Sequence, residues 1–141
     1  MPPLVIRAFR EKDRKPLVAL WRACDLTRPW NPPNRDIDFC RRSGHGRIFV
    51  ATVAGRIVGS VMAGHDGHRG WLYYVAAAPD LQKSGIGKAL TRHAEAWLRK
   101  LGVPKVMLLI RPENKRVRRF YEAIGYELEP RILMTRRLDG S

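Results

Sequence analysis

Residues 71–88, WLYYVAAAPDLQKSGIGK, decide how the rest of the chain is interpreted. The apolar and aromatic segment 71–78 predicts a strand, which Pro79 ends. The turn 82–88 then leads into an amphipathic pattern over 85–101, which predicts a long helix. A glycine-bearing turn between a strand and a helix leaves backbone N–H groups unpaired, and these groups together with the helix dipole favour an anion. The segment therefore predicts a turn that binds phosphate.

The composition of this turn suits a diphosphate. Gly85 and Gly87 keep side chains away from a phosphate that approaches the backbone, and Lys83 and Lys88 add positive charge. Two nucleotide-binding motifs do not fit. A P-loop requires Ser or Thr after Lys88, where this chain has alanine, and a Rossmann fingerprint requires a third glycine at position 90, where it has leucine.

The rest of the chain predicts a mixed sheet with helices packed on it. Alternating or short apolar runs predict strands at residues 4–9, 47–53, 57–63, 71–78 and 106–110, and one or two final strands at 126–128 and 132–138. Helical spacing predicts helices from Asp13, as a cap, to about residue 24 and over about 34–42, 85–101 and 115–124. Three prolines within residues 28–33 predict a loop between the first two helices. Strict alternation would place Tyr73 and Tyr74 on opposite faces of their strand.

Length and composition predict one globular domain over residues 1–141. The chain of 16.2 kDa has ordinary apolar content, no bilayer-spanning run and no signal-peptide pattern, so a cytoplasmic protein is expected. Cys24 and Cys40 fit no disulfide framework or metal motif and are expected to be free thiols. The net charge of +14 is spread evenly along the chain. Residues 1–70 have 13 basic and 6 acidic residues, and residues 71–141 have 14 basic and 7 acidic residues, so each half has a net charge of +7. Such a surface attracts polyanions of any class.

Two segments resemble the GCN5-related N-acetyltransferase (GNAT) family. Residues 82–87, QKSGIG, match the acyl-CoA motif Gln/Arg-x-x-Gly-x-Gly/Ala at every fixed position. Asn114 followed by residues 121–126, YEAIGY, is similar to the ending Asn-x6-Tyr-Glu-x-x-Gly-Phe/Tyr. Residues 28–30 and 66–70 are similar to the small bacterial YpeA-type branch. The resemblance covers nearly the whole chain and implies an α/β (α+β mixed) fold: a mixed, mostly antiparallel sheet of six to seven strands flanked by about four helices, splayed between strands 71–78 and 106–110.

The resemblance implies an acetyl-CoA-dependent N-acetyltransferase that releases CoA and uses no metal. Backbone amides of the turn would hold the diphosphate, strand residues would pair with the pantetheine arm, and Asn114 would contact the cofactor arm. The residues implied in cofactor binding are Val75, Ala76, Ala77, Gln82, Lys83, Ser84, Gly85, Ile86, Gly87, Lys88 and Asn114. The basic residues of 115–119 form a solvated helix face or meet the 3′-phosphate of CoA.

Tyr121 is the catalytic residue that the resemblance implies. The amine would attack the thioester directly in a ternary complex, and Tyr121 would protonate the departing thiolate as a general acid. The attacking amine must also lose a proton to a base. The candidate bases are Asp66, His65 and His68, each acting through water, and the remaining alternative is that the protein has no dedicated base. In the branch that acetylates ribosomal-protein N-termini, a glutamate lies five residues before the asparagine. Leu109 stands there in this chain, which disfavours that substrate.

The acceptor is expected to be a primary amine of a small molecule or a protein, and its identity stays open. Trp30, Asp66 and Tyr73 are candidate substrate-binding residues, although Trp30 also fits a loop anchor. The resemblance allows a homodimer and gives no role at a membrane. Two alternatives stay open: a CoA-binding relative without catalysis, and a basic nucleic-acid-binding module. The second has the charge but no RRM, KH or zinc-finger signature, so specific nucleic-acid binding is not expected.

Overall fold

The computed structural model describes residues 2–140 and divides the chain into two compact units, residues 1–108 and 109–141. The first unit holds the whole sheet and three α-helices, and the second holds one helix and the C-terminal segment. No helix among residues 2–140 has the length and apolar character needed to cross a membrane. The expectation of one domain over residues 1–141 stays a prediction.

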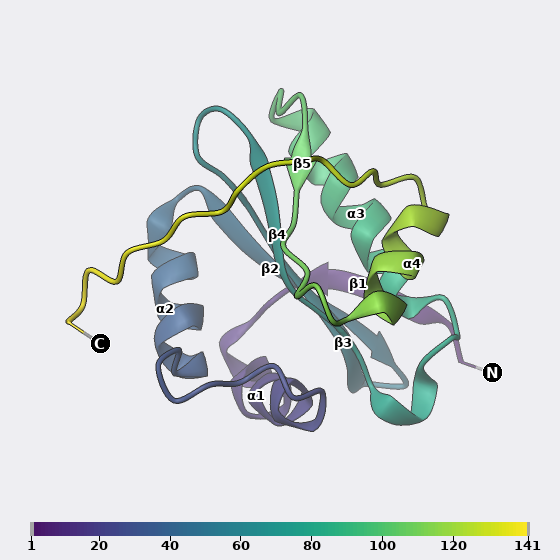
Figure 1. Cartoon of the computed structure of the whole chain (residues 1–141). Coiled ribbons are helices and arrows are strands. Elements are labelled where there is room, and N and C mark those ends of the chain that lie inside the picture. Colours follow the sequence, from purple (N-terminus) through teal and green to yellow (C-terminus); the bar gives the residue numbers. More distant parts are fainter. Residues whose placement is uncertain (1, 141) are drawn as a thin grey trace. The chain divides into compact units, whose positions relative to one another are not determined.

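The first unit is built on a five-stranded mixed sheet in the order β1-β2-β3-β4-β5 (Figure 1). The first four strands are antiparallel to their neighbours, whereas β5 runs parallel to β4. The strands are β1 (Leu4–Ala8), β2 (Gly46–Val53), β3 (Arg56–His65), β4 (Gly70–Ala77) and β5 (Val106–Met107). The mixed, mostly antiparallel sheet that the sequence predicts is therefore confirmed.

Helices cover both faces of this sheet. Helix α1 (Arg14–Ala23) and helix α2 (Pro33–Ser43) pack on one face, and helix α3 (Ile86–Lys100) packs on the other. Two consecutive residues of β3 show that these faces are opposite. Gly59 faces α3, and Ser60 accepts a hydrogen bond from Trp21 of α1 at 2.9 Å.

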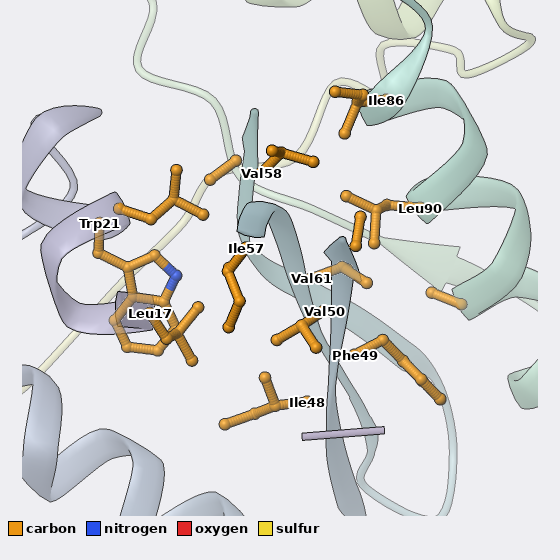
Figure 2. Close-up of a cluster of buried hydrophobic side chains, with 14 of the residues drawn as sticks. Leu17, Trp21, Ile48, Phe49, Val50, Ile57, Val58, Val61, Ile86 and Leu90 are labelled. Atoms are coloured by element: carbon orange, nitrogen blue, oxygen red, sulfur yellow. The ribbon is translucent and has the colours of Figure 1, made fainter. Parts of the chain in front are cut away.

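The core of the first unit lies in two layers, one on each side of β2 and β3 (Figure 2). Leu17 and Trp21 of α1 are fully buried against one face, and Leu90 of α3 is fully buried against the other. The apolar run of β2 is buried almost without interruption, as expected for a strand that is covered on both faces. The amphipathic spacing in the sequence thus identifies the residues that hold the helices to the sheet.

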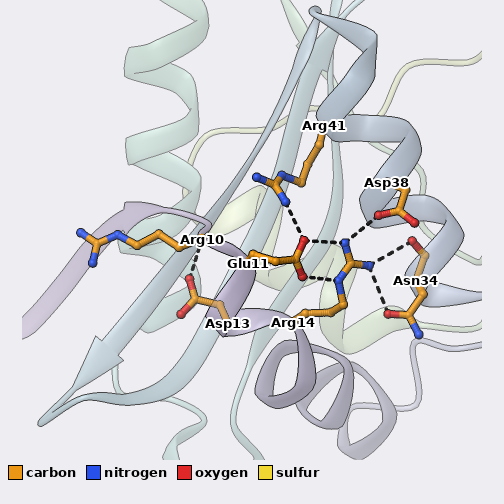
Figure 3. Close-up of polar contacts among 7 residues, drawn as sticks. All are labelled: Arg10, Glu11, Asp13, Arg14, Asn34, Asp38 and Arg41. Carbon is orange, nitrogen blue, oxygen red and sulfur yellow. Dashed lines mark hydrogen bonds and ion pairs between the residues drawn. The ribbon is translucent and has the colours of Figure 1, made fainter.

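Polar contacts hold the start of α1 to α2 (Figure 3). A short 3-10 helix, η1 (Glu11–Asp13), precedes α1. Arg14 contacts both Glu11 and Asp38, with an Nη2–Oδ1 distance of 2.6 Å to Asp38. Asp13 does not cap α1 through its side chain, contrary to the sequence prediction. Its buried carboxylate instead accepts two hydrogen bonds from Arg7, at 2.7 and 2.9 Å, because a buried charge needs a paired partner.

The second unit corrects the predicted strand count. Its helix is α4 (Lys115–Ala123), and residues 126–138 form no strand among the described residues. The strands predicted at 126–128 and 132–138 are therefore absent, and the sheet has five strands instead of six or seven. An apolar alternating pattern forms a strand only where a neighbouring edge accepts its backbone hydrogen bonds. Within this segment Ile132 and Leu138 are each 92% exposed.

Gly59 lies where the sheet and α3 pack too closely for a side chain. An added Cβ would lie 2.7 Å from Ile86 Cγ2, 2.7 Å from Leu90 Cδ1 and 2.9 Å from the Ala76 carbonyl oxygen, so the backbone itself would have to move. We expect Gly59→Ala to lower the free energy of unfolding by about 1–3 kcal/mol in a denaturant titration. Gly64→Ala in the same strand is the control, because an added Cβ there would lie 3.2 Å from its nearest neighbour, the His45 carbonyl oxygen. This variant should lose less unfolding free energy than Gly59→Ala. Wild-type stability of Gly59→Ala would contradict this packing.

Candidate active site

The turn between β4 and α3 is exposed and irregular. It passes through the short 3-10 helix η2 (Pro79–Leu81), and Lys83 and Gly85 take left-handed backbone angles, with φ of +68° and +86°. Residues 82–85 are exposed, whereas Ile86 is buried against the sheet. The turn is therefore fixed at its helical end and open to solvent at its tip.

The backbone N–H groups of this turn are free to bind a ligand. Within residues 2–140, the N–H groups of residues 83–88 donate to no backbone carbonyl, and the first helical bond runs from the Ala89 N–H to the Gly85 oxygen. An added Cβ at Gly85 would meet nothing within 4 Å, so this side of the turn faces open space. Unpaired N–H groups at the start of a 15-residue helix attract an anion. The geometry thus suits the diphosphate that the sequence predicts here.

The side chains of the turn mostly bind the protein itself. Gln82 Nε2 lies 3.5 Å from the Ala77 carbonyl oxygen, and the Ser84 hydroxyl donates to the Leu81 carbonyl. Ile86 is part of the core. Of the predicted cofactor-binding residues in this segment, these three therefore offer a ligand mainly their backbone. Lys83 and Lys88 are exposed cations that flank the open tip.

One edge of β4 is free along most of its length. Strand β5 pairs only with the first two residues of β4, as Gly70–Val106 and Trp71–Met107. From Leu72 to Ala77 this edge has no strand partner among the described residues, although β3 continues to pair on the other side. The predicted residues Val75, Ala76 and Ala77 lie on this segment. An unpaired strand edge presents N–H and C=O groups to which an extended ligand can add as a further strand.

A β-bulge interrupts β4 next to this edge. The register with β3 shifts between Ser60 and Met62, and Tyr74 has a φ of +53°, which is rare for a residue with a side chain. The Ser60 hydroxyl donates to the Tyr74 carbonyl at 2.7 Å and holds the bulge. Tyr74 also stacks on Trp21, with ring centroids 3.8 Å apart.

The bulge corrects the predicted orientation of the two tyrosines. Tyr73 pairs with Met62, which is two residues from Ser60 and therefore faces α1 as well. Tyr74 contacts Trp21 on this same face. The expectation that the tyrosines occupy opposite faces is therefore wrong, because the extra residue of the bulge breaks the alternation. Tyr73 is 47% exposed and is available to a ligand on the α1/α2 face.

The loop that carries the predicted base Asp66 uses this carboxylate to hold its own shape. Oδ1 accepts from the backbone N–H groups of His68 and Arg69, at 2.9 and 2.8 Å, and Oδ2 accepts from Trp71 Nε1 at 3.2 Å. These bonds lower the pKa of Asp66 to about 2, with the Arg69 N–H as the largest cause. A carboxylate with this pKa is a weak base. His65 also acts within the loop, because its Nδ1 accepts from the Gly67 N–H at 3.2 Å.

Trp30 lies in the loop between α1 and α2, as the prolines predict. The bridge between Arg28 and Asn31 closes a turn around it, and Arg35 of α2 donates to its carbonyl at 3.0 Å. The Trp30 side chain is 50% exposed. The loop is therefore held by its backbone, and the indole is left with a large accessible surface.

The second unit contains the other two predicted site residues. Asn114 is the N-cap of α4, and its Oδ1 accepts from the Val117 N–H at 3.4 Å. Tyr121 is buried between the rings of Phe120 and Tyr126, with centroids 4.9 and 5.3 Å away. Burial raises the pKa of Tyr121 to about 12, so the hydroxyl keeps its proton at neutral pH. That hydroxyl donates to no side chain or carbonyl among residues 2–140.

Sequence reasoning missed one side chain at the bulge. Asp36 of α2 accepts a hydrogen bond from the Tyr74 hydroxyl at 2.7 Å. The two residues are 38 positions apart, and no motif connects them. Only the fold brings α2 and the bulge of β4 together, so spacing along the chain carries no signal for this contact.

Comparisons with known proteins identify the family of this chain. The model of the Acetyltransferase (GNAT) family matches residues 11–126. Acetyltransferase SG1711 of Sodalis glossinidius is 42% identical over 92% of this chain and 91% of its own length. Acetyltransferase ECA0875 of Pectobacterium atrosepticum is 43% identical over 94% of both chains.

A solved structure extends this comparison to the fold. The aminoglycoside acetyltransferase AAC(6')-Iy, in complex with the bisubstrate analogue CoA-S-monomethyl-acetylneamine, superposes with a TM-score of 0.81. The superposition covers 96% of this chain and 98% of that one at 18% identity, so this likeness concerns the fold alone. With the family model and the two close relatives, the result is clear: the chain belongs to the GNAT family of N-acetyltransferases.

Proposed function

We propose that this protein transfers an acetyl group from acetyl-CoA to a primary amine. The observation that carries the proposal is the row of free N–H groups at residues 83–88, behind the open tip at Gly85. These groups and the two flanking lysines would hold the diphosphate. The free edge of β4 at residues 75–77 would pair with the pantetheine arm. Relatives named acetyltransferases support this assignment.

The reaction would be a direct transfer within a ternary complex. The amine nitrogen attacks the thioester carbonyl carbon, a C–N bond forms, and the C–S bond breaks. The departing thiolate takes a proton from the Tyr121 hydroxyl, and the nitrogen loses its proton through water. Tyr121 suits this role because burial keeps its hydroxyl protonated and no protein group among residues 2–140 takes its proton. Asn114 would contact the cofactor arm through the part of its amide that does not cap α4.

A similar structure and the charge of the chain support a small-molecule amine as the acceptor. The solved acetyltransferase that superposes on this chain was bound to an analogue joining CoA to an aminoglycoside, which supports a small-molecule amine for this chain too. The net charge of +14 repels polycations, so an acceptor with few positive charges fits this surface better than a basic protein or a multiply charged aminoglycoside.

Calorimetry followed by an assay of thiol release tests the proposal. Acetyl-CoA should bind to the purified protein, and CoA thiol should appear with at least one amine of a panel of aminoglycosides, diamines and peptides. Binding without thiol release from any amine would support a CoA-binding relative without catalysis. The absence of acetyl-CoA binding would overturn the proposal. A structure-specific affinity for DNA or RNA, instead of a steep loss of binding with salt, would support a nucleic-acid-binding module.

Gly85 provides a test of the diphosphate site. Gly85→Ala introduces a methyl group on the open side of the turn and disfavours the backbone angle that aims the N–H groups. We expect the Kd for acetyl-CoA to rise about tenfold, which is about 1.4 kcal/mol. Gly102→Ala is the matched control, since Gly102 follows the same helix with a φ of +83° and also has nothing within 4 Å. Both variants should lose about 1 kcal/mol of stability, but only Gly85→Ala should lose affinity. Equal affinities of the two variants for acetyl-CoA would contradict a diphosphate site at this turn.

Tyr121 provides a test of the chemical step. Tyr121→Phe removes only the proton donor, so kcat should fall by about 10²-fold or more, while the Kd for acetyl-CoA should change little. Tyr126→Phe removes a hydroxyl from the neighbouring ring and serves as the control. Because the Tyr121 pKa is about 12, wild-type kcat should show no loss from its ionisation up to about pH 10. Unchanged kcat in Tyr121→Phe would remove this residue from the mechanism.

A further inference from the structure

Carboxylates are scarce in the first unit, and nearly all of them are neutralised. Eight acidic residues lie within residues 2–108, in a chain with 27 basic residues. Six of the eight pair with an arginine, as Figure 3 shows for two of them. The six are Glu11, Asp13, Asp25, Asp38, Asp80 and Glu95. A seventh, Asp66, accepts two backbone N–H groups of its own loop and the indole N–H of Trp71 in β4.

Asp36 is the exception among these eight residues. It makes no ion pair within the described part of the chain, and its carboxylate accepts one hydrogen bond, from the neutral Tyr74 hydroxyl. The adjacent Arg35 donates to the Trp30 carbonyl, and its positive charge also acts on Tyr74. An ionised carboxylate can accept about four hydrogen bonds, so Asp36 keeps most of its capacity for a ligand.

Three successive hydrogen bonds and one ring stack connect α1, the bulge of β4 and Asp36. Trp21 donates to Ser60, so the Ser60 hydroxyl must direct its own hydrogen to the Tyr74 carbonyl. The Tyr74 ring stacks on Trp21, which is fully buried, with an interplanar angle of 13°. Its hydroxyl then reaches Asp36. The position of the carboxylate is therefore fixed by the same residues that fix the bulge.

The surroundings of Asp36 suit an ammonium group. It lies on the α1/α2 face of β4, beside Tyr74 and on the same face as the half-exposed Tyr73. Aromatic faces attract cations, and a carboxylate without an arginine partner supplies the opposite charge. The free segment of β4 runs past this bulge, from Leu72 to Ala77, and the proposed function places the thioester arm along its residues 75–77. A cation at Asp36 would thus lie within about one tyrosine side chain of that segment.

We propose that Asp36 binds the amine acceptor as its ammonium ion on the α1/α2 face of β4. The nitrogen releases one proton to water before its lone pair attacks the thioester, and the second proton leaves after the C–N bond has formed. Tyr74 orients the carboxylate, and Tyr73 is a half-exposed ring on the same face of the sheet. The role as an acetyl acceptor site rests on the proposed function, whereas binding of an ammonium ion at Asp36 does not. In a strongly cationic protein, one carboxylate left free of arginine allows a positively charged substrate to bind.

An NMR titration tests this proposal without acetyl transfer. Butylamine, as its ammonium ion, and butan-1-ol are added separately to the ¹⁵N-labelled protein at constant ionic strength. The ammonium ion should shift the amide signals of residues 36, 73 and 74 in a saturable manner, and the uncharged alcohol should not. Equal shifts with the two probes, or no saturable shift with butylamine at millimolar concentrations, would overturn the proposal.

Two asparagine variants on the same helix give the matched comparison. Asp36→Asn removes the charge but keeps an oxygen that accepts from Tyr74, so its melting temperature should stay near that of the wild type. We expect its affinity for butylamine to fall about tenfold. Asp38→Asn makes the same change of net charge two residues away and should keep wild-type affinity. Equal losses in both variants would indicate a general charge effect and contradict the site. Acetyl-CoA calorimetry on the same proteins reports separately on the proposed function.

Discussion

The start of α3 packs directly on the sheet, and the rest of the proposed site depends on this contact. Gly59 leaves room for Ile86 and Leu90, which are buried against β3. Because these two side chains hold the first turn of the helix, the backbone before them is fixed without using its own N–H groups. Apolar packing on one side of the turn thus leaves a row of oriented donors on the other side. A preorganised set of donors costs little further ordering when an anion binds.

The bulge at Tyr74 is the second constraint, and it separates two surfaces of β4. On one side, pairing with β5 ends after two residues and leaves a free edge. On the α1/α2 face, the extra residue brings Tyr73 and Tyr74 to the same side, next to Asp36. The unusual backbone angle of Tyr74 persists because a hydrogen bond from Ser60 and the stack on Trp21 hold it. A strand with regular alternation would not bring both tyrosines to the α1/α2 face.

Much of the first unit could be predicted from the sequence, because its signals are local. The helical period of 85–101 and the apolar runs of β2 and β3 identify the elements to within about two residues. The motif at 82–87 predicts the turn, since backbone angles such as that of Gly85 require glycine. The arginine pair of Asp13 could not be predicted, nor could the contact of Asp36 with Tyr74, since each depends on residues that only the fold brings together. The strands predicted at 126–128 and 132–138 failed for a related reason, because apolar alternation does not specify a partner edge.

The proposed function depends above all on the binding of the coenzyme A diphosphate by main-chain donors at the start of α3. Calorimetric titration with dephospho-CoA and with pantetheine tests it most directly, because both carry the thiol arm but only the first carries the diphosphate. If the claim holds, dephospho-CoA binds nearly as tightly as CoA, and pantetheine binds far more weakly. Equal affinities for dephospho-CoA and pantetheine would show that the turn does not hold the diphosphate, and would contradict the account.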